Sequence, residues 1–534
     1  MASRLYNETG SLTRFIIRRD RVRIPIWLLS LSSVTFLTAI AFKDLYVTDI
    51  DRQAIAETMR NPAMTAMVGK GYGLDNYTNG AMMAHQMLLF TAIIVALMSI
   101  LLVARHTRAD EEEGRIELIR SLPVGRLSNL SATILVLIGM NVLLALIVGI
   151  GLYALKIESM DLNGSLLYGA ALGVTGIFFT AITAVFAQLA ENSRGTIGLS
   201  FVILGGSYLI RAIGDVSNET MSWFSPFGWI LSSEVYVNNY WWPILLTIGA
   251  SVVLFIFAYN LNSFRDLGAG FLPSKPGKKH ASLFLQSPLG LSFRLQRTGI
   301  IAWTLGMFVL GASYGSVLGD IESYFKDIDM LKDILTPTEG FSLTEQFVSM
   351  IMSILAMIST VPALIAILKL KGEEGKNRTE HLLSRAVSRT KLLASYLIVS
   401  FGIGFLVLSM TAIGLWSAGA AVMDEGIAFS TIYGAAIVYL PAMGVMIGLA
   451  VLFLGFAPSL TGLSWIYLLY SFIVVYLGKL LQFPEWMSNL SPYGYIPQLP
   501  IEDMKFMSVL MLTIIAIITS LIGFLFYNKR DIHG

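Results

Sequence analysis

The most prominent pattern in this chain is a series of long apolar runs separated by short polar segments. Each run is close to the roughly 20 residues that a helix needs to cross the hydrocarbon core of a bilayer. Very short gaps around residues 190–195 and 457–460 predict two tight helical hairpins. The runs predict membrane-spanning helices at 24–42, 81–104, 129–155, 164–190, 195–214, 241–261, 300–318, 347–368, 391–420, 427–457, 460–480 and 506–527.

The distribution of positive charge predicts the orientation of these spans. If the N-terminus is cytoplasmic, the cytoplasmic segments contain most of the 37 Lys and Arg residues. The outer segment 320–346 is acidic instead. By the positive-inside rule, both termini are expected in the cytoplasm, as an even number of spans requires.

The second half of the chain repeats features of the first. Segments 110–126 and 373–389 align without a gap, and outer segment 225–229 (Ser-Pro-Phe-Gly-Trp) recurs at 491–495 as Ser-Pro-Tyr-Gly-Tyr. The last run of each half ends in Arg-Asp, at Arg265 and Arg530. Six spans per copy would make the copies parallel. We therefore predict an all-α polytopic membrane protein of about 12 transmembrane helices in two parallel six-helix repeats, with halves at 1–270 and 287–534 and a cytoplasmic linker at 271–286.

The repeated segments 110–126 and 373–389 are the strongest candidates for contact with a soluble partner. Glu precedes Arg by four residues in both, a spacing that supports a helix. Ile116, Ile119 and Leu122 add an apolar stripe, so a short amphipathic helix could dock into a groove. The alternative is a solvated loop whose charges fix orientation. The predicted docking residues are Glu111, Glu113, Arg115, Glu117, Arg126, Glu374, Arg378, Glu380 and Arg389.

Segments 11–23 and 287–299 precede the first span of each half and mix arginines with apolar residues. This pattern fits a helix lying along the inner membrane interface. It fits equally well a basic tail that fixes topology.

Composition and absent motifs exclude several functions. The chain is 55% apolar and 13% charged, has a net charge of +2, and contains no cysteine and five histidines without metal-site spacing. No phosphate-binding loop of the form GxxxxGK[ST] occurs. We therefore expect no enzymatic activity and no cofactor in this chain, with ATP and Mg²⁺, if used, bound by a partner. The basic clusters lack interleaved aromatic residues, so no nucleic-acid partner is expected.

A few polar residues fall within or beside the predicted spans and could line a translocation path or an outer gate. His85 lies near the outer end of the second span, while Arg211 and Lys479 occupy matching places in the fifth span of each half. Pro226 and Pro492 lie in the repeated outer segments. The alternative for Arg211 and Lys479 is snorkelling to the outer headgroups.

The docking-segment motif EEGRIEL-x4-PVxR, the outer Ser-Pro-aromatic-Gly-aromatic segment and the RDLGAG run at 265–270 resemble fused permeases of bacterial type V ABC exporters. Among these, the tetronasin-resistance, or polyketide-antibiotic, group is most similar. The resemblance implies that 110–126 and 373–389 act as coupling helices against two copies of a soluble ABC ATPase. It also implies re-entrant segments around 215–240 and 481–503. Ala386 replaces Pro123 in the second copy, so the two docks could be unequal.

The resemblance further implies a location in the bacterial cell membrane, among membrane lipid, and export of a hydrophobic or amphipathic small molecule such as a polyketide-like antibiotic. An ion-coupled twelve-span secondary transporter is the alternative. It would require acidic residues within the spans, and none falls inside the ranges given above. A membrane sensor or scaffold would not need two matching docking segments.

Overall fold

The computed structural model describes residues 5–272, 279–319, 341–385, 387–423, 426–477 and 484–531. The chain divides into two compact units, Met1–Pro276 and Gly277–Gly534. The division falls within the segment predicted as a linker, of which residues 273–278 lie outside the described ranges.

The described residues contain twelve helices that are long and apolar enough to cross a membrane, which confirms the prediction of an all-α polytopic membrane protein. Their positions agree with the apolar runs to within a few residues at most ends. In the first unit they are α3 (Arg23–Leu45), α6 (Asn79–Ala104), α9 (Ser128–Ala154), α10 (Leu162–Leu189), α11 (Ser193–Ser217) and α14 (Trp242–Phe264). In the second they are α15 (Pro288–Gly315), α18 (Leu343–Glu374), α20 (Arg389–Val422), α21 with α22 (Phe429–Ile437, Leu440–Phe456), η4 with α23 (Pro458–Gly462, Leu463–Leu477) and α25 (Phe506–Lys529).

Short helices occupy the connections between the spans. In the first unit they are α2 (Thr9–Arg19), α4 (Asp49–Met59), α5 (Pro62–Val68), η1 (Leu74–Asn76), η2 (Arg105–Ala109), α7 (Asp110–Glu112), α8 (Arg115–Arg120), α12 (Glu219–Ser222) and α13 (Pro226–Leu231). In the second they are η3 (Leu283–Gln286), α19 (Glu380–Leu383), α24 (Glu485–Asn489) and η5 (Pro492–Tyr495).

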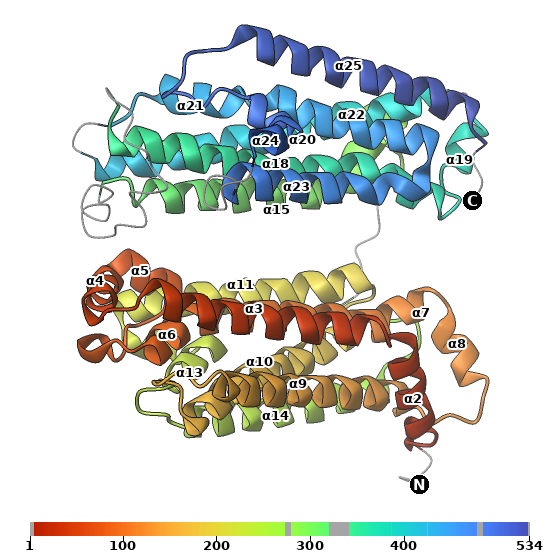
Figure 1. Cartoon of the computed structure of the whole chain (residues 1–534). Helices are drawn as coiled ribbons and strands as arrows, with labels where there is room; N and C mark the ends of the chain where they lie inside the picture. The colour runs from red at the N-terminus through yellow and green to blue at the C-terminus, as the bar shows by residue number, and fades with distance from the viewer. Residues whose placement is uncertain are drawn as a thin grey trace. The chain divides into compact units, whose positions relative to one another are not determined.

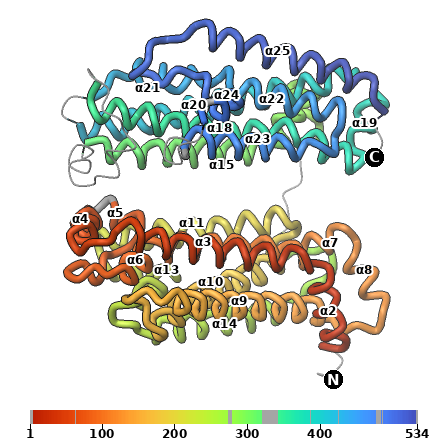
Figure 2. Tube along the Cα trace, viewed as in Figure 1, coloured from red at the N-terminus to blue at the C-terminus, as the bar shows by residue number. Residues whose placement is uncertain are grey.

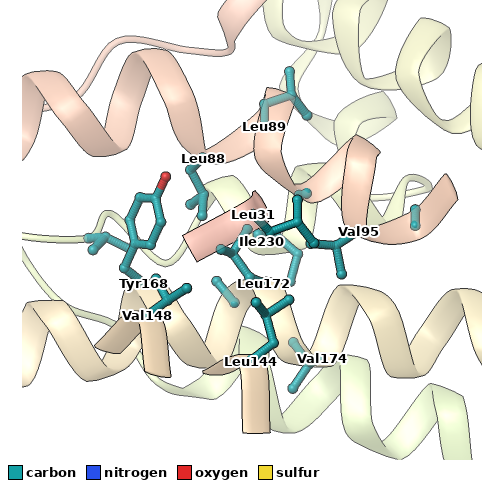
Figure 3. Close-up of a cluster of buried hydrophobic side chains, with 14 of the residues drawn as sticks. Leu31, Leu88, Leu89, Val95, Leu144, Val148, Tyr168, Leu172, Val174 and Ile230 are labelled. Carbon is teal, nitrogen blue, oxygen red and sulfur yellow. The ribbon is translucent and has the colours of Figure 1, made fainter. Parts of the chain in front are cut away.

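The first unit is built around α6, α9 and α10, whose facing side chains are almost fully buried. Because lipid is as apolar as these side chains, close packing rather than hydrophobic transfer holds such helices together. The close-up in Figure 3 shows this packing, with the following residues labelled: Leu31, Leu88, Leu89, Val95, Leu144, Val148, Tyr168, Leu172, Val174 and Ile230.

Different short helices lie at the two ends of the first unit. Helices α2, α7 and α8 lie together at one end of the long helices, and α4 and α5 lie at the opposite end (Figure 1). In the second unit, α19 and the C-terminal end of α25 lie at one shared end, which Figure 2 also shows. The docking segments therefore sit at helix ends, as loops between spans must.

The segments before the first span of each half differ between the units. Residues 9–19 form the separate helix α2, whereas residues 288–299 belong to the continuous helix α15. Pro25 lies two residues before Trp27, and the matching residue before Trp303 is Ile301. A proline is tolerated in the first turn of a helix but not in its interior, so Pro25 separates α2 from α3 and Ile301 permits continuity.

A buried charge network holds α2 against the end of α6. Arg19 donates to Asp110 at 2.8 Å and contacts Nδ1 of His106, while Nε2 of His106 donates to Asp20 at 2.6 Å. His106 and Asp20 are each 1% exposed. Since Arg19 can only donate, Nδ1 of His106 is the acceptor and the proton lies on Nε2.

Candidate functional site

The first docking segment is not the continuous helix that the Glu111–Arg115 spacing predicted. The π-helical turn η2 follows α6, and the chain then forms α7 and α8. Gly114 separates these at a φ of +73°, a left-handed conformation that glycine adopts without the steric cost of a Cβ. Glu111 and Arg115 therefore lie in different helices.

The carboxylate of Glu111 points into the protein and not toward a partner. It accepts hydrogen bonds from Arg265 Nη1 and Nη2 at 3.1 and 2.9 Å, and from the backbone N–H of Gly268 at 2.7 Å. Arg108, which is 1% exposed, adds an ion pair at 3.3 Å. Glu111 thus joins the end of span α6 to the end of span α14.

The other end of the same segment attaches to the same arginine. Arg126 Nη2 donates to the carbonyl oxygen of Arg265 at 2.8 Å. We call Glu111, Arg126 and Arg265 the first bracket. Between its two anchors, residues 112–125 form a projecting segment that we call the first docking arm.

The second unit contains the same arrangement. Glu374 forms a short ion pair with Arg530 and accepts a 2.7 Å hydrogen bond from the Tyr527 hydroxyl. Arg389 Nη1 donates to the carbonyl oxygen of Arg530 at 2.6 Å. These residues form the second bracket, and residues 375–388 form the second docking arm, of which Ala386 is outside the described ranges.

The remaining predicted docking residues are on the exposed arms. Glu113, Arg115 and Glu117 are exposed in the first arm, as are Arg378 and Glu380 in the second. The hydrogen bond to Asp110, at 2.7 Å, raises the pKa of Arg115, which therefore stays charged. Arg378 pairs at 3.3 Å with Glu373, the residue that aligns with Asp110.

The apolar residues of the first arm divide between two faces. Ile116 is 5% exposed and Ile119 packs against the core of its own unit, so these two are not available to a partner. Leu118 and Leu122 are 72% and 60% exposed. The surface available for docking is therefore a charged arm with two protruding leucines.

At the opposite end of the first unit, Arg211 is completely buried and does not snorkel to headgroups. Its guanidinium donates to the carbonyl oxygens of Thr65, Ala66 and Met67 at 3.1, 2.9 and 3.3 Å and pairs with Asp215 at 3.3 Å. A cation that binds the last carbonyls of a helix is favourable because those groups lack helical partners. Arg211 therefore holds α5 against span α11.

His85 anchors the adjoining part of the same loop. It is fully buried, with Nδ1 2.8 Å from the Tyr77 hydroxyl and Nε2 3.1 Å from the carbonyl oxygen of Gly69. His85 and Arg211 thus both fasten residues 65–77 to the spans. Lys479, the predicted counterpart of Arg211, lies outside the described residues.

Pro226 and Pro492 begin matching buried turns. In both, the preceding serine accepts a hydrogen bond from the residue after the proline, at 3.2 Å. A Cβ on Gly228 or Gly494 would collide with the carbonyl oxygen of Ser222 or Ser488, respectively, which explains the glycine of each motif. The aromatic residue between them packs inward: Phe227 stacks on Phe179, and Tyr493 on Tyr439.

Two apolar hollows lie along the spans. One, of about 420 Å³, lies between α6 and α11 and is lined by Phe90, Ile93, Leu97, Phe201, Leu204, Gly205 and Tyr208. The other, of about 480 Å³, lies among α20, α22 and α25. The hydroxyls in the second hollow, Thr513 and Ser520, donate to carbonyls of their own helix at 2.8 and 2.7 Å. Both hollows therefore present hydrocarbon, which suits an apolar ligand.

Metal chemistry finds no support in this site. Across the part of the chain that the structure describes, no group of three or more His, Cys, Asp or Glu side chains could hold a metal ion.

Sequence reasoning missed the partners of the matched glutamates. Arg108, Arg265, Tyr527 and Arg530 were not among the candidates, although the Arg-Asp ending of each half was visible. That repetition at the end of the last span was the available signal.

Comparison with known proteins identifies the class. A family profile described as "Multidrug efflux system permease Rv1217c, C-terminal domain" matches residues 15–265 and 285–528. The multidrug efflux system permease protein Rv1217c of Mycobacterium tuberculosis (strain ATCC 25618 / H37Rv) is 37% identical over 535 residues, covering 99% of this chain and 96% of that protein. The chain therefore belongs to the Rv1217c family of multidrug efflux permeases.

Proposed function

We propose that this chain is the membrane subunit of an ATP-driven exporter and works with two copies of a separate ABC ATPase. The observation that carries the proposal is the pair of exposed, charged docking arms at matching places in the two units. Without a phosphate-binding loop in the chain, ATP and Mg²⁺ would be bound by the partner. The resemblance to type V exporter permeases of the tetronasin-resistance group supports the same assignment.

The proposed substrate is a hydrophobic or amphipathic compound moved out across the bacterial plasma membrane. The two apolar hollows support this class, since neither offers a charged group to a ligand. The relative from Mycobacterium tuberculosis is named as a multidrug efflux permease, which fits a site that accepts several apolar molecules. The distribution of Lys and Arg supports a cytoplasmic position for both termini.

An ion-coupled secondary transporter is favoured by one observation. Helix α11 extends beyond its predicted range to Ser217, so Asp215 lies within a span helix. Acidic residues also lie near the ends of α3 (Asp44) and α18 (Glu345, Glu373 and Glu374). Asp215 is paired with Arg211, however, and that arginine is bound to three backbone carbonyls. A coupling carboxylate must exchange protons or ions, so this pairing supports a structural role for Asp215.

Reconstitution separates the two functions. The chain is co-expressed with a candidate ABC ATPase from the same organism, purified, and placed in proteoliposomes with a panel of hydrophobic compounds. We expect the ATPase to co-purify and its hydrolysis to be stimulated by transported compounds. Transport that runs on a proton or sodium gradient without the ATPase would support the secondary transporter instead.

A further inference from the structure

We propose that Arg265 and Arg530 are positioning residues that transmit movement of each docking arm to the last span of the same unit. This inference rests on the proposed function, since it concerns how a docked ATPase would move the membrane helices. It reassigns four predicted docking residues, Glu111, Arg126, Glu374 and Arg389, to internal anchoring.

Each docking arm is fastened at both ends to one residue. The first arm has further contacts, from Ser193 to Glu112 and between Asn7 and residues 123–125. In the first unit, Glu111 binds the side chain of Arg265 and Arg126 binds its carbonyl oxygen. In the second unit, Glu374 and Arg389 bind Arg530 in the same two ways. An arm held at one end could swing freely, whereas an arm held at both ends moves together with its anchor.

The Glu–Arg pairs of both brackets are largely shielded from water, which makes them stiff. The side chains of Glu111 and Arg265 are 9% and 7% exposed, and those of Glu374 and Arg530 are 6% and 17% exposed. Charge-assisted hydrogen bonds are strong where water is excluded, and removing one partner leaves an uncompensated charge. An exposed ion pair would separate easily when the arm moves, because water can solvate both charges at little cost in free energy.

The position of each arginine determines what moves. Helix α14 ends at Phe264 and α25 ends at Lys529, so Arg265 and Arg530 directly follow the last span of each unit. A helix resists compression and bending along its axis, because each turn is hydrogen-bonded to the next. Displacement of an arm would therefore displace α14 or α25 as a unit.

The two units also show which contact is essential to the arrangement. Glu111 has Arg108 and the N–H of Gly268 as additional partners, whereas Glu374 has the Tyr527 hydroxyl. These additional partners are not of the same chemical type in the two units and do not come from matching positions. The Glu–Arg pair and the Arg-to-carbonyl bond are common to both units, so they are the elements to test.

The second bracket permits the sharper test, because Arg530 is the cation paired with Glu374 among the described residues. The variants are Glu374→Arg, Arg530→Glu and the double exchange, each purified with the ATPase and reconstituted. Lys505→Glu serves as the control, since the Lys505–Glu502 pair is exposed and outside both brackets. Three quantities are measured: the amount of ATPase retained, the basal hydrolysis rate, and transport per ATP hydrolysed.

We expect both single variants to retain the ATPase and its basal hydrolysis but to lose transport per ATP by about tenfold, the middle of the usual range of coupling between sites. The double exchange should recover most of that loss, because it restores the ion pair with the positive charge at position 374 and the negative charge at position 530. If the single variants fold poorly, Tyr527→Phe removes one hydrogen bond to Glu374 at constant charge and should give a smaller loss of the same kind.

Two results would overturn the inference while leaving the proposed function intact. One is release of the ATPase by Glu374→Arg without recovery in the double exchange, which would place Glu374 in the docking interface. The other is full coupling in all variants, Tyr527→Phe included. Failure of the ATPase to associate even with the unmodified chain would instead overturn the proposed function.

Discussion

The carboxylate of Glu111 accepts two hydrogen bonds from the guanidinium of Arg265, a residue 154 positions later in the chain. Glu374 and Arg530, 156 positions apart, form the corresponding pair in the second unit. Glu111 and Glu374 are therefore anchors of the docking arms, and the surface that a partner could touch lies between each of them and the arginine at the other end of its arm.

Reversal of charge on the first docking arm should weaken binding of the ATPase. Glu113 and Glu117 are exposed, so Glu113→Lys and Glu117→Lys should each cost about 1 kcal/mol or less of binding free energy. The loss should shrink at high salt because exposed charges are screened. Affinity measured at two salt concentrations checks this, and a loss that does not depend on salt would contradict it.

Truncation of Arg211 should destabilise the first unit at the end where α5 contacts α11. Arg211→Ala would leave Asp215, whose side chain is 8% exposed, without its ion-pair partner. It would also remove the hydrogen-bond donor to the last carbonyl groups of α5. We expect a loss of about 3–5 kcal/mol in the free energy of unfolding, as for other broken buried ion pairs. Thermal unfolding of the purified protein measures it.

Lys70→Ala is the matched control for Arg211→Ala. The Lys70–Glu219 pair is more than half exposed on both sides, so its removal should cost about 0–1 kcal/mol. Equal effects of the two substitutions would show that the burial of Arg211 has no energetic importance.

The glycines of the two Ser-Pro-aromatic-Gly turns should not tolerate a methyl group. A Cβ at Gly228 or Gly494 collides with a backbone carbonyl, which cannot rotate away as a side chain can. Alanine at either position should therefore destabilise the protein by about 1–3 kcal/mol. Gly249→Ala in α14 meets no atom within 4 Å and should be neutral or stabilising. Thermal unfolding distinguishes them.

Filling the hollow between α6 and α11 should reduce transport of bulky compounds. Gly205 lines that hollow, and a Cβ there meets nothing within 4 Å, so Gly205→Trp can fold while occupying the space. Its neighbour Gly206 is equally open but does not line the hollow, so Gly206→Trp is the control. The measurement is compound-stimulated ATPase activity, and equal activity of both variants would exclude this hollow as a substrate site.

The spans could be predicted from the sequence because their signal is local. Twenty consecutive apolar residues require no knowledge of distant partners, and each of the twelve runs coincides with a helix of the structure. The separation of α2 from α3 could also be predicted locally, because Pro25 can lie in the first turn of a helix but not in its interior. The break in the first docking segment was visible as Gly114, although the Glu–Arg spacing argued for a continuous helix.

The anchoring of the arms could not be predicted because it depends on long-range pairing. Charged residues repeated at a loop fit both a docking face and an internal ion pair, and only burial distinguishes the two. Arg211 illustrates the same limit: its position near the end of a span fits snorkelling, but the carbonyls that it binds belong to helix α5, almost 150 residues earlier. Sequence spacing carries no information about such contacts.

The central claim, that the docking arms face the cytoplasm and bind an ATPase, is tested most directly by site-specific cross-linking. The chain contains no cysteine, so Leu118→Cys on the exposed face of the first arm provides a single reactive thiol. Phe224→Cys, 78% exposed in the opposite loop region, is the control. We predict that a short thiol-to-amine cross-linker joins Leu118→Cys, and not Phe224→Cys, to the ATPase subunit in intact complexes. Labelling of Leu118→Cys by a membrane-impermeant maleimide added outside intact cells would contradict the account.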